Sequence, residues 1–178
     1  MTHYQIVKEI DVLLETIDFL LDRGVKPYRI SSPKGKGIDR QSDEQRIWQV
    51  LTSNDIPAVY PFSDEGPDIV GISATEWWQV ECKGSGAGKA QTQRNNFDRA
   101  LASVVSYYEK EAKKLPKNYQ GWSKAQPYWG LALPASRAYP NELKKRVRQP
   151  LRKVLNFWVL LYETESEKIR AVSPEDSY

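Results

Sequence analysis

The chain has 178 residues, 40 % of them hydrophobic, and its 6 Trp, 10 Tyr and 4 Phe argue against a disordered chain. Its 26 basic and 23 acidic residues give a net charge of +3, which alone indicates no particular partner. One Cys (Cys82) and one His (His3) disfavour a disulfide framework, a structural zinc site and His-dependent hydrolysis. No apolar run reaches the roughly 18 residues of a membrane span, and the N-terminus lacks a signal-peptide pattern. We therefore expect one cytoplasmic domain, 1–178, with no membrane contact.

The first part of the chain predicts two helices separated by a basic linker. Residues 4–23 repeat apolar side chains at helical spacing. Residues 24–40 combine Pro and Gly with several Lys and Arg, which is typical of a linker. A capping box formed by Ser42 and Gln45 begins the second helix, which we expect to end near Asn54.

The rest of the chain predicts strands and helices in alternation. The expected strands are 56–60, 68–73, 77–83, 128–134, 157–162 and 168–172. We expect one helix over about 90–112 and a basic helix over 140–155 that Pro150 breaks, with a loose tail from Pro174. The pattern therefore predicts an α/β fold with a mixed central sheet flanked by helices.

Two carboxylates and a lysine lie close together in the sequence at 68–83. Asp68 follows Gly66 and Pro67, and Glu81 and Lys83 lie on one face of the strand after it because strand side chains alternate. If residues 74 and 75 centre the turn, paired positions sum to 149 and Asp68 lies opposite Glu81. Two adjacent carboxylates repel each other unless a cation or a proton lies between them, so a divalent metal ion is expected here.

This arrangement resembles the PD-(D/E)xK nuclease superfamily, which has the restriction-endonuclease-like fold. The matching residues are Pro67-Asp68, followed after a 12-residue gap by Glu81-Cys82-Lys83. The expected order of elements over about 42–134 also resembles the αβββαβ core of that family, with 4–23 as an added N-terminal helix and 135–178 as a C-terminal basic helix and strands. The resemblance covers roughly half of the chain.

The resemblance implies a metal-dependent hydrolysis of phosphodiester bonds, most readily in DNA. Asp68 and Glu81 would hold Mg²⁺, with Mn²⁺ as a substitute, and Lys83 would orient the attacking water or stabilise charge on the phosphoryl oxygens. Members often carry a Glu on the helix before the first strand, and Glu44 fits that position as a further metal ligand. Many carry a Gln at the start of the helix after the Glu-x-Lys strand. Gln91 is preferred here over Gln93 because Gln93 shares a helical face with apolar residues.

Basic residues outside this motif predict a phosphate-binding surface. Lys89 follows a Gly-rich loop at a helix N-terminus, where backbone N–H groups favour phosphate. The loop differs from a nucleotide-binding P-loop in its spacing and in Ala90, which stands where Ser or Thr binds Mg²⁺. A second group of cations lies near the C-terminus and has either a solvated or a nucleic-acid-binding role: Lys144, Lys145, Arg146, Arg148, Arg152 and Lys153.

The sequence thus predicts a Mg²⁺-dependent nuclease acting on DNA. The alternative from another class is a non-catalytic nucleic-acid-binding or interaction module with the same fold. A homodimer is also considered, because the apolar positions of helix 4–23 exceed what one narrow face needs. Endonuclease or exonuclease action, sequence preference and the choice between DNA and RNA stay open at this stage.

Overall fold

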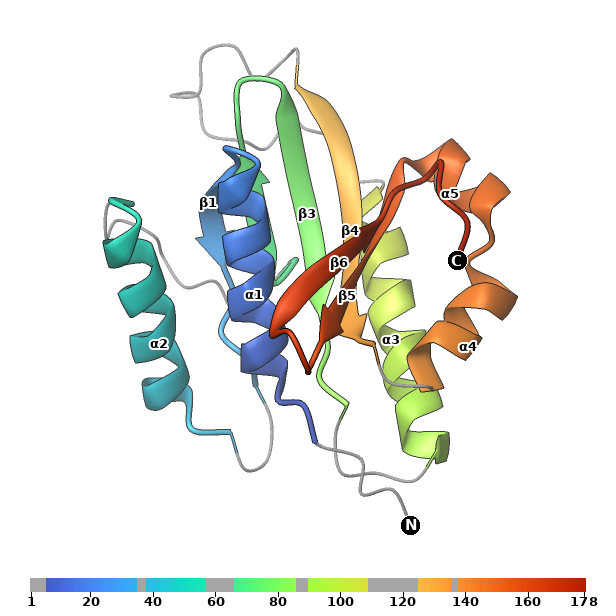
Figure 1. The fold of residues 1–178 in the computed structure, drawn as a ribbon, viewed down its shortest axis with the longest axis horizontal. Coiled ribbons are helices and arrows are strands. Elements are labelled where there is room, and N and C mark those ends of the chain that lie inside the picture. Colours follow the sequence, from blue (N-terminus) through green and yellow to red (C-terminus); the bar gives the residue numbers. More distant parts are fainter. Residues whose placement is uncertain (1–5, 35–37, 57–65, 86–89, 109–124, 136–137) are drawn as a thin grey trace.

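A six-stranded mixed sheet forms the centre of the protein (Figure 1). The computed structural model describes residues 6–34, 38–56, 66–85, 90–108, 125–135 and 138–178. The strands lie side by side in chain order, antiparallel except for the β3–β4 and β4–β5 pairs, which are parallel. Their bounds are β1 Lys26–Ile30, β2 Ile69–Ile72, β3 Glu76–Cys82, β4 Gln126–Pro134, β5 Phe157–Glu163 and β6 Lys168–Val172. The expected α/β class with a mixed sheet is therefore confirmed.

Helices cover both faces of the sheet (Figure 1). On one face, α1 (Glu9–Asp22) and α2 (Arg40–Ser53) pack with Trp78, Val80 and Cys82 of β3. On the other, α3 (Ala90–Tyr108) and α4 (Ala138–Arg146) pack with β4 and β5, and α5 (Gln149–Leu155) contacts β5. The central strands are buried on both sides, which explains why their sequences are apolar runs rather than clean alternations.

The basic segment 24–40 is not simply a linker, because it contains β1. This strand lies at the edge of the sheet and pairs antiparallel with β2, with a register shift between Pro27 and Arg29. An edge strand tolerates Pro and charged side chains, because one row of its backbone groups needs no partner strand. The sequence composition is therefore compatible with a strand that the linker prediction missed. The expected strand 56–60 lies almost entirely outside the described residues.

This correction changes which helix comes before the first strand of the sheet. The elements run α1-β1-β2-β3-α3-β4, with α2 inserted between β1 and β2. The expected core began instead with the helix that is now α2. The helix directly before the first strand is therefore α1 and not α2.

The apolar positions of α1 are used within the chain itself. Seven of its residues are buried, because α1 contacts the sheet and also packs against α2. The large number of apolar positions in this helix was the reason for considering a homodimer. Packing within the chain accounts for these positions without a second subunit. None of the described helices combines the length and hydropathy that a membrane crossing requires.

The C-terminal region differs from expectation in one respect. As predicted, the basic helix is interrupted, and Pro150 lies in the first turn of α5, where it needs no backbone donor. The tail, however, is anchored rather than loose. Arg152 is 0 % exposed, donates hydrogen bonds to the carbonyls of Ser173 and Asp176, and lies over the ring of Tyr178.

Candidate active site

The hairpin of β2 and β3 brings Asp68 and Glu81 together. Ile69 pairs with Val80, and Val70 pairs with Gln79, so paired positions sum to 149 as the sequence predicts. Asp68 directly precedes β2, and extending this register by one residue sets it opposite Glu81. The backbone N–H of Cys82 donates a hydrogen bond of 2.7 Å to Oδ2 of Asp68, which joins this carboxylate to the end of β3.

The environment of Asp68 disfavours its charged form in the absence of a cation. Burial raises the pKa of Asp68 well above its ordinary value, and the carboxylates of Glu81 and Glu9 raise it further. The Cys82 N–H and the Lys83 ammonium lower this pKa, but they do not cancel the effect of burial and like charge. An acid in such surroundings is suited to binding a cation, since the cation removes the repulsion that raises the pKa.

Glu81 is held from the opposite side by helix α3. Its side chain is 9 % exposed, and the hydroxyl of Tyr107 lies 3.1 Å from Oε2 of Glu81 and 3.0 Å from the carbonyl oxygen of Gly66. Tyr107 thus links α3 to both carboxylate-bearing segments. Burial raises the pKa of Glu81, whereas Lys83 and the Tyr107 hydroxyl oppose that rise.

Lys83 lies just beyond β3 and is paired with Glu9, the first residue of α1. Its Nζ is 2.8 Å from Oε2 of Glu9. Burial acts to lower the pKa of Lys83, but Glu9, Asp68 and Glu81 outweigh it and the net shift is upward. The lysine therefore stays protonated at neutral pH while these acids are ionised, which suits a donor or an electrostatic stabiliser rather than a base.

Gly84 explains how α1 can approach β3 so closely. A Cβ built on Gly84 would lie 2.6 Å from the carbonyl oxygen of Val7 and 2.6 Å from the backbone nitrogen of Glu9. Ser85 completes the contact, because its N–H donates to Val7 and its hydroxyl accepts from the Val7 N–H. Glu9 was missed by the sequence analysis, since an acid in the first turn of a helix is common and only the tertiary contact distinguishes it.

A small cavity of about 150 Å³ opens onto these side chains. Its described lining includes Glu9, Asp68 and Lys83, together with Gly66 and residues 31–34. Two acids, Glu9 and Asp68, and two lysines, Lys34 and Lys83, therefore lie on the described wall of a solvent-accessible space next to β2 and β3, whereas Glu81 is not part of that wall. Such a space can admit a hydrated cation and a phosphate oxygen.

The other predicted site residues, Glu44, Gln91 and Gln93, are not in the described lining of the small cavity. Oε1 of Glu44 accepts hydrogen bonds from the Ser32 hydroxyl at 2.9 Å and from Nε of Arg40 at 2.7 Å. Glu44 is not in the described lining of the small cavity, but its hydrogen-bond partner Ser32 is. Gln91 is exposed and donates to Asn95 on its own helix, and neither Gln91 nor Gln93 lines the small cavity.

The predicted phosphate-binding cations are divided among several environments. Lys144, Lys145 and Arg148 are exposed, whereas Arg146 forms ion pairs with Asp98 and Glu142. The prediction of Arg152 as a phosphate contact is contradicted, because its side chain is buried and its guanidinium donates a hydrogen bond to the C-terminal tail. Lys89 lies outside the described residues.

The residues present are compatible with a hard divalent cation. Among the described residues, no group of three or more His, Cys, Asp or Glu side chains is placed so that it could hold a metal ion together. Asp68 and Glu81 nevertheless offer carboxylate oxygens, and Mg²⁺ commonly binds through one or two carboxylates while keeping several waters. Glu9 adds a third carboxylate at the rim, where it is paired with Lys83.

Fold and site together define an α/β protein whose mixed sheet carries an acidic site with one lysine at the ends of two strands. Comparison with protein-family models, curated proteins and solved structures found no match.

Proposed function

We propose that this protein is a Mg²⁺-dependent nuclease that hydrolyses phosphodiester bonds in DNA. The observation that carries the proposal is the proximity of the Asp68 and Glu81 carboxylates, which the β2–β3 register sets, beside Lys83. The order α1-β1-α2-β2-β3-α3-β4 adds support, because it differs from an αβββαβ succession only by the inserted helix α2. A purely structural role for these acids is disfavoured, since buried like charges cost stability unless they serve binding.

Each residue has a role that follows from its surroundings. A metal bound at Asp68 and Glu81 would polarise the phosphate and lower the pKa of a bound water. The Cys82 N–H and the Tyr107 hydroxyl fix the directions of the two carboxylates. Lys83 donates toward the attacking water or toward a phosphoryl oxygen, where negative charge grows in the transition state. Glu9 keeps the Lys83 ammonium charged and in place.

Plasmid cleavage tests this proposal directly. Supercoiled plasmid is incubated with the protein and Mg²⁺ or Mn²⁺, beside an EDTA control and the Asp68→Asn and Lys83→Ala variants. Asp98→Asn and Lys168→Ala are matched controls, because both side chains are exposed and neither lines the small cavity. We expect metal-dependent nicking or linearisation that only the two site variants lose, by a factor of at least about 100.

Two results would contradict the proposal. Cleavage that survives both site substitutions would show that these residues do not carry the activity. Absence of cleavage of plasmid, single-stranded DNA, branched DNA and RNA, together with no Mn²⁺ binding by calorimetry, would favour the non-catalytic nucleic-acid-binding module.

A further inference from the structure

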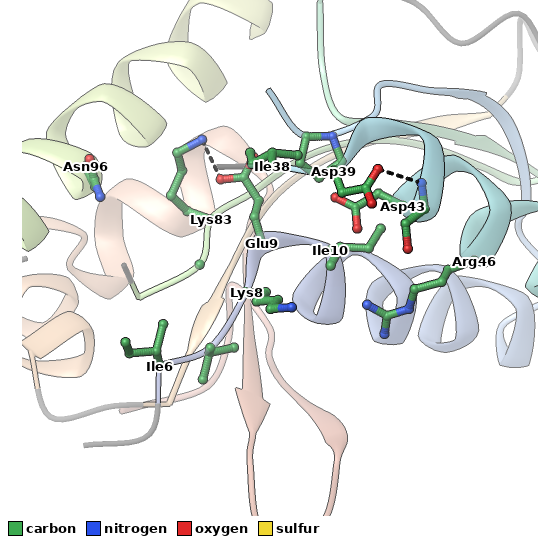
Figure 2. A pocket seen from close by; sticks show the side chains of 14 residues that line it. Ile6, Lys8, Glu9, Ile10, Ile38, Asp39, Asp43, Arg46, Lys83 and Asn96 are labelled. Atoms are coloured by element: carbon green, nitrogen blue, oxygen red, sulfur yellow. Dashed lines mark hydrogen bonds and ion pairs between the residues drawn. The ribbon is translucent and has the colours of Figure 1, made fainter. Parts of the chain in front are cut away.

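A second and larger cavity lies directly beside the site. It has a volume of about 460 Å³ and shares Glu9, Pro33 and Lys83 with the small cavity at Asp68. Its described lining comes from the segment that enters α1, from the start of α2, from the exit of β3 and from Asn96 on α3 (Figure 2). A ligand with one charged group at Asp68 and Lys83 can therefore extend its next part into this cavity.

The size and apolar wall of the larger cavity suit a flat ring. Pockets for small organic ligands have volumes of about 300 to 1,000 Å³ and are lined mainly by apolar groups, with a few placed polar ones. The apolar part of this wall consists of Ile6, Val7, Ile10, Pro33 and Ile38. Ile6 is 58 % exposed although it is large and apolar, which places hydrophobic surface at the opening.

The polar part of the wall offers one carboxylate that the fold does not use. Asp39 and Asp43 lie close together on the same side of the cavity (Figure 2). Asp39 caps α2 by accepting the Ser42 N–H, and Arg46 is held by Asp11 at 2.9 Å. Among the described residues, none makes a hydrogen bond or ion pair with the Asp43 carboxylate, although Asp43 is half-buried.

We propose that this cavity binds the base of the nucleotide adjacent to the scissile phosphate and that Asp43 selects guanine. The inference rests on the proposed nuclease function. A carboxylate is an acceptor with two oxygens, and the N1–H and N2–H groups of guanine are two adjacent donors that match it. Adenine, cytosine and thymine each present a ring or carbonyl acceptor beside their donor, and that acceptor is repelled by one carboxylate oxygen.

The charges around the cavity favour a base over a second metal ion. Lys8, Arg46 and Lys83 line the same space as Glu9, Asp39 and Asp43, so cations and anions are equal in number. The attraction of a metal ion to the three carboxylates is therefore offset by its repulsion from the three cations, whereas a neutral base attached to an anionic phosphate suits both parts of the wall.

Binding of deoxynucleoside monophosphates in EDTA tests the inference without any need for cleavage. Calorimetry or ligand-observed NMR is used with dGMP, dAMP, dCMP and TMP on the full chain. We expect dGMP to bind at least about tenfold more tightly than the other three nucleotides. Asp43→Asn, which replaces one acceptor oxygen with a donor, should abolish this preference. Asp55→Asn, at an exposed position just beyond the C-terminal end of α2, should keep it.

The outcomes separate the two proposals. Equal binding of all four nucleotides, no binding of any of them, or a dGMP preference that persists in Asp43→Asn would overturn the guanine pocket. Metal-dependent cleavage would still uphold the nuclease in those cases. Selective dGMP binding that depends on Asp43 would uphold the pocket even if plasmid cleavage failed.

Discussion

Among single residues, Glu9 and Glu44 provide a direct comparison. Both are acids in the N-terminal halves of helices on the same face of the sheet, but of the two it is Glu9 that pairs with Lys83. Glu9→Gln removes the ion pair, so the pKa of Lys83 should fall, because burial then acts with less opposition. We expect cleavage to fall by about 10- to 100-fold, the usual cost of losing a group that orients a site. The alkaline limb of the pH–rate profile should also shift to lower pH, because Lys83 then loses its proton at a lower pH.

Glu44→Gln is the matched control for that change. The amide oxygen can still accept from Ser32, and Glu44 does not line the small cavity. The measurement is a pH–rate profile of both variants, with the Lys83 ammonium followed by NMR. Equal losses in the two variants would show that the contact between Glu9 and Lys83 has no special role.

Among the elements, the approach of α1 to β3 depends on the missing side chain of Gly84. In Gly84→Ala the new Cβ would meet two backbone atoms at 2.6 Å, and backbone cannot yield as a flexible side chain can. We expect a loss of about 1–3 kcal/mol in the free energy of unfolding, typical of overpacking, measured by urea denaturation. Mn²⁺ affinity should fall as well, because Glu9 and Lys83 move apart.

Gly71→Ala separates the two effects of that substitution. Its Cβ would meet Cγ1 of Val25 at 2.8 Å, within the core and away from the small cavity. We expect Gly71→Ala to lower stability while leaving Mn²⁺ affinity unchanged. Similar Mn²⁺ affinities in the two variants would contradict the role assigned to Gly84.

The same contact shows where sequence reasoning succeeds and where it stops. The register of the β2–β3 hairpin, which sets Asp68 next to Glu81, was predictable because a short hairpin and strand alternation determine it locally. Glu9 was not, because its sequence distance from Lys83 is bridged only by tertiary packing. The edge strand β1 was missed because Pro27 and its cations resemble a linker, and for that reason α2 instead of α1 was expected to precede the first strand.

At the scale of the whole molecule, Arg152 fastens the C-terminus to α5. Its guanidinium donates to the carbonyls of Ser173 and Asp176 and lies 4.5 Å from the ring centroid of Tyr178. Arg152→Met leaves those carbonyls without their donor, and we expect a loss of about 2–4 kcal/mol in the free energy of unfolding. Arg148→Met, at an exposed position, should change stability by less than about 0.5 kcal/mol. Equal denaturation midpoints for the two variants would contradict this role.

The site also predicts how the stability of the whole protein depends on pH and metal. Asp68 and Glu81 have raised pKa values in the folded state, so the folded protein binds their protons more tightly than the unfolded chain does. Below the pKa values of the unfolded chain, about 4, the two acids do not affect the free energy of unfolding. As pH rises from there through the pKa values of the folded state, they lower it. The raised pKa of Lys83 acts only at alkaline pH, outside this range.

Asp68→Asn should consequently stabilise the metal-free protein at neutral pH. The amide oxygen can still accept from the Cys82 N–H, while the charge that Glu81 and Glu9 repel is gone. Each pKa unit of elevation corresponds to about 1.4 kcal/mol, so the variant should melt a few degrees above wild type in EDTA at about pH 7.5. At about pH 4 the melting temperatures of wild type and variant should converge.

Mg²⁺ should raise the melting temperature of wild type at neutral pH more than that of the variant, because the cation relieves a repulsion that the variant lacks. Calorimetric scans at several pH values measure both effects, and a difference between wild type and variant that stays constant with pH would contradict the assignment of Asp68 as a buried, cation-binding acid.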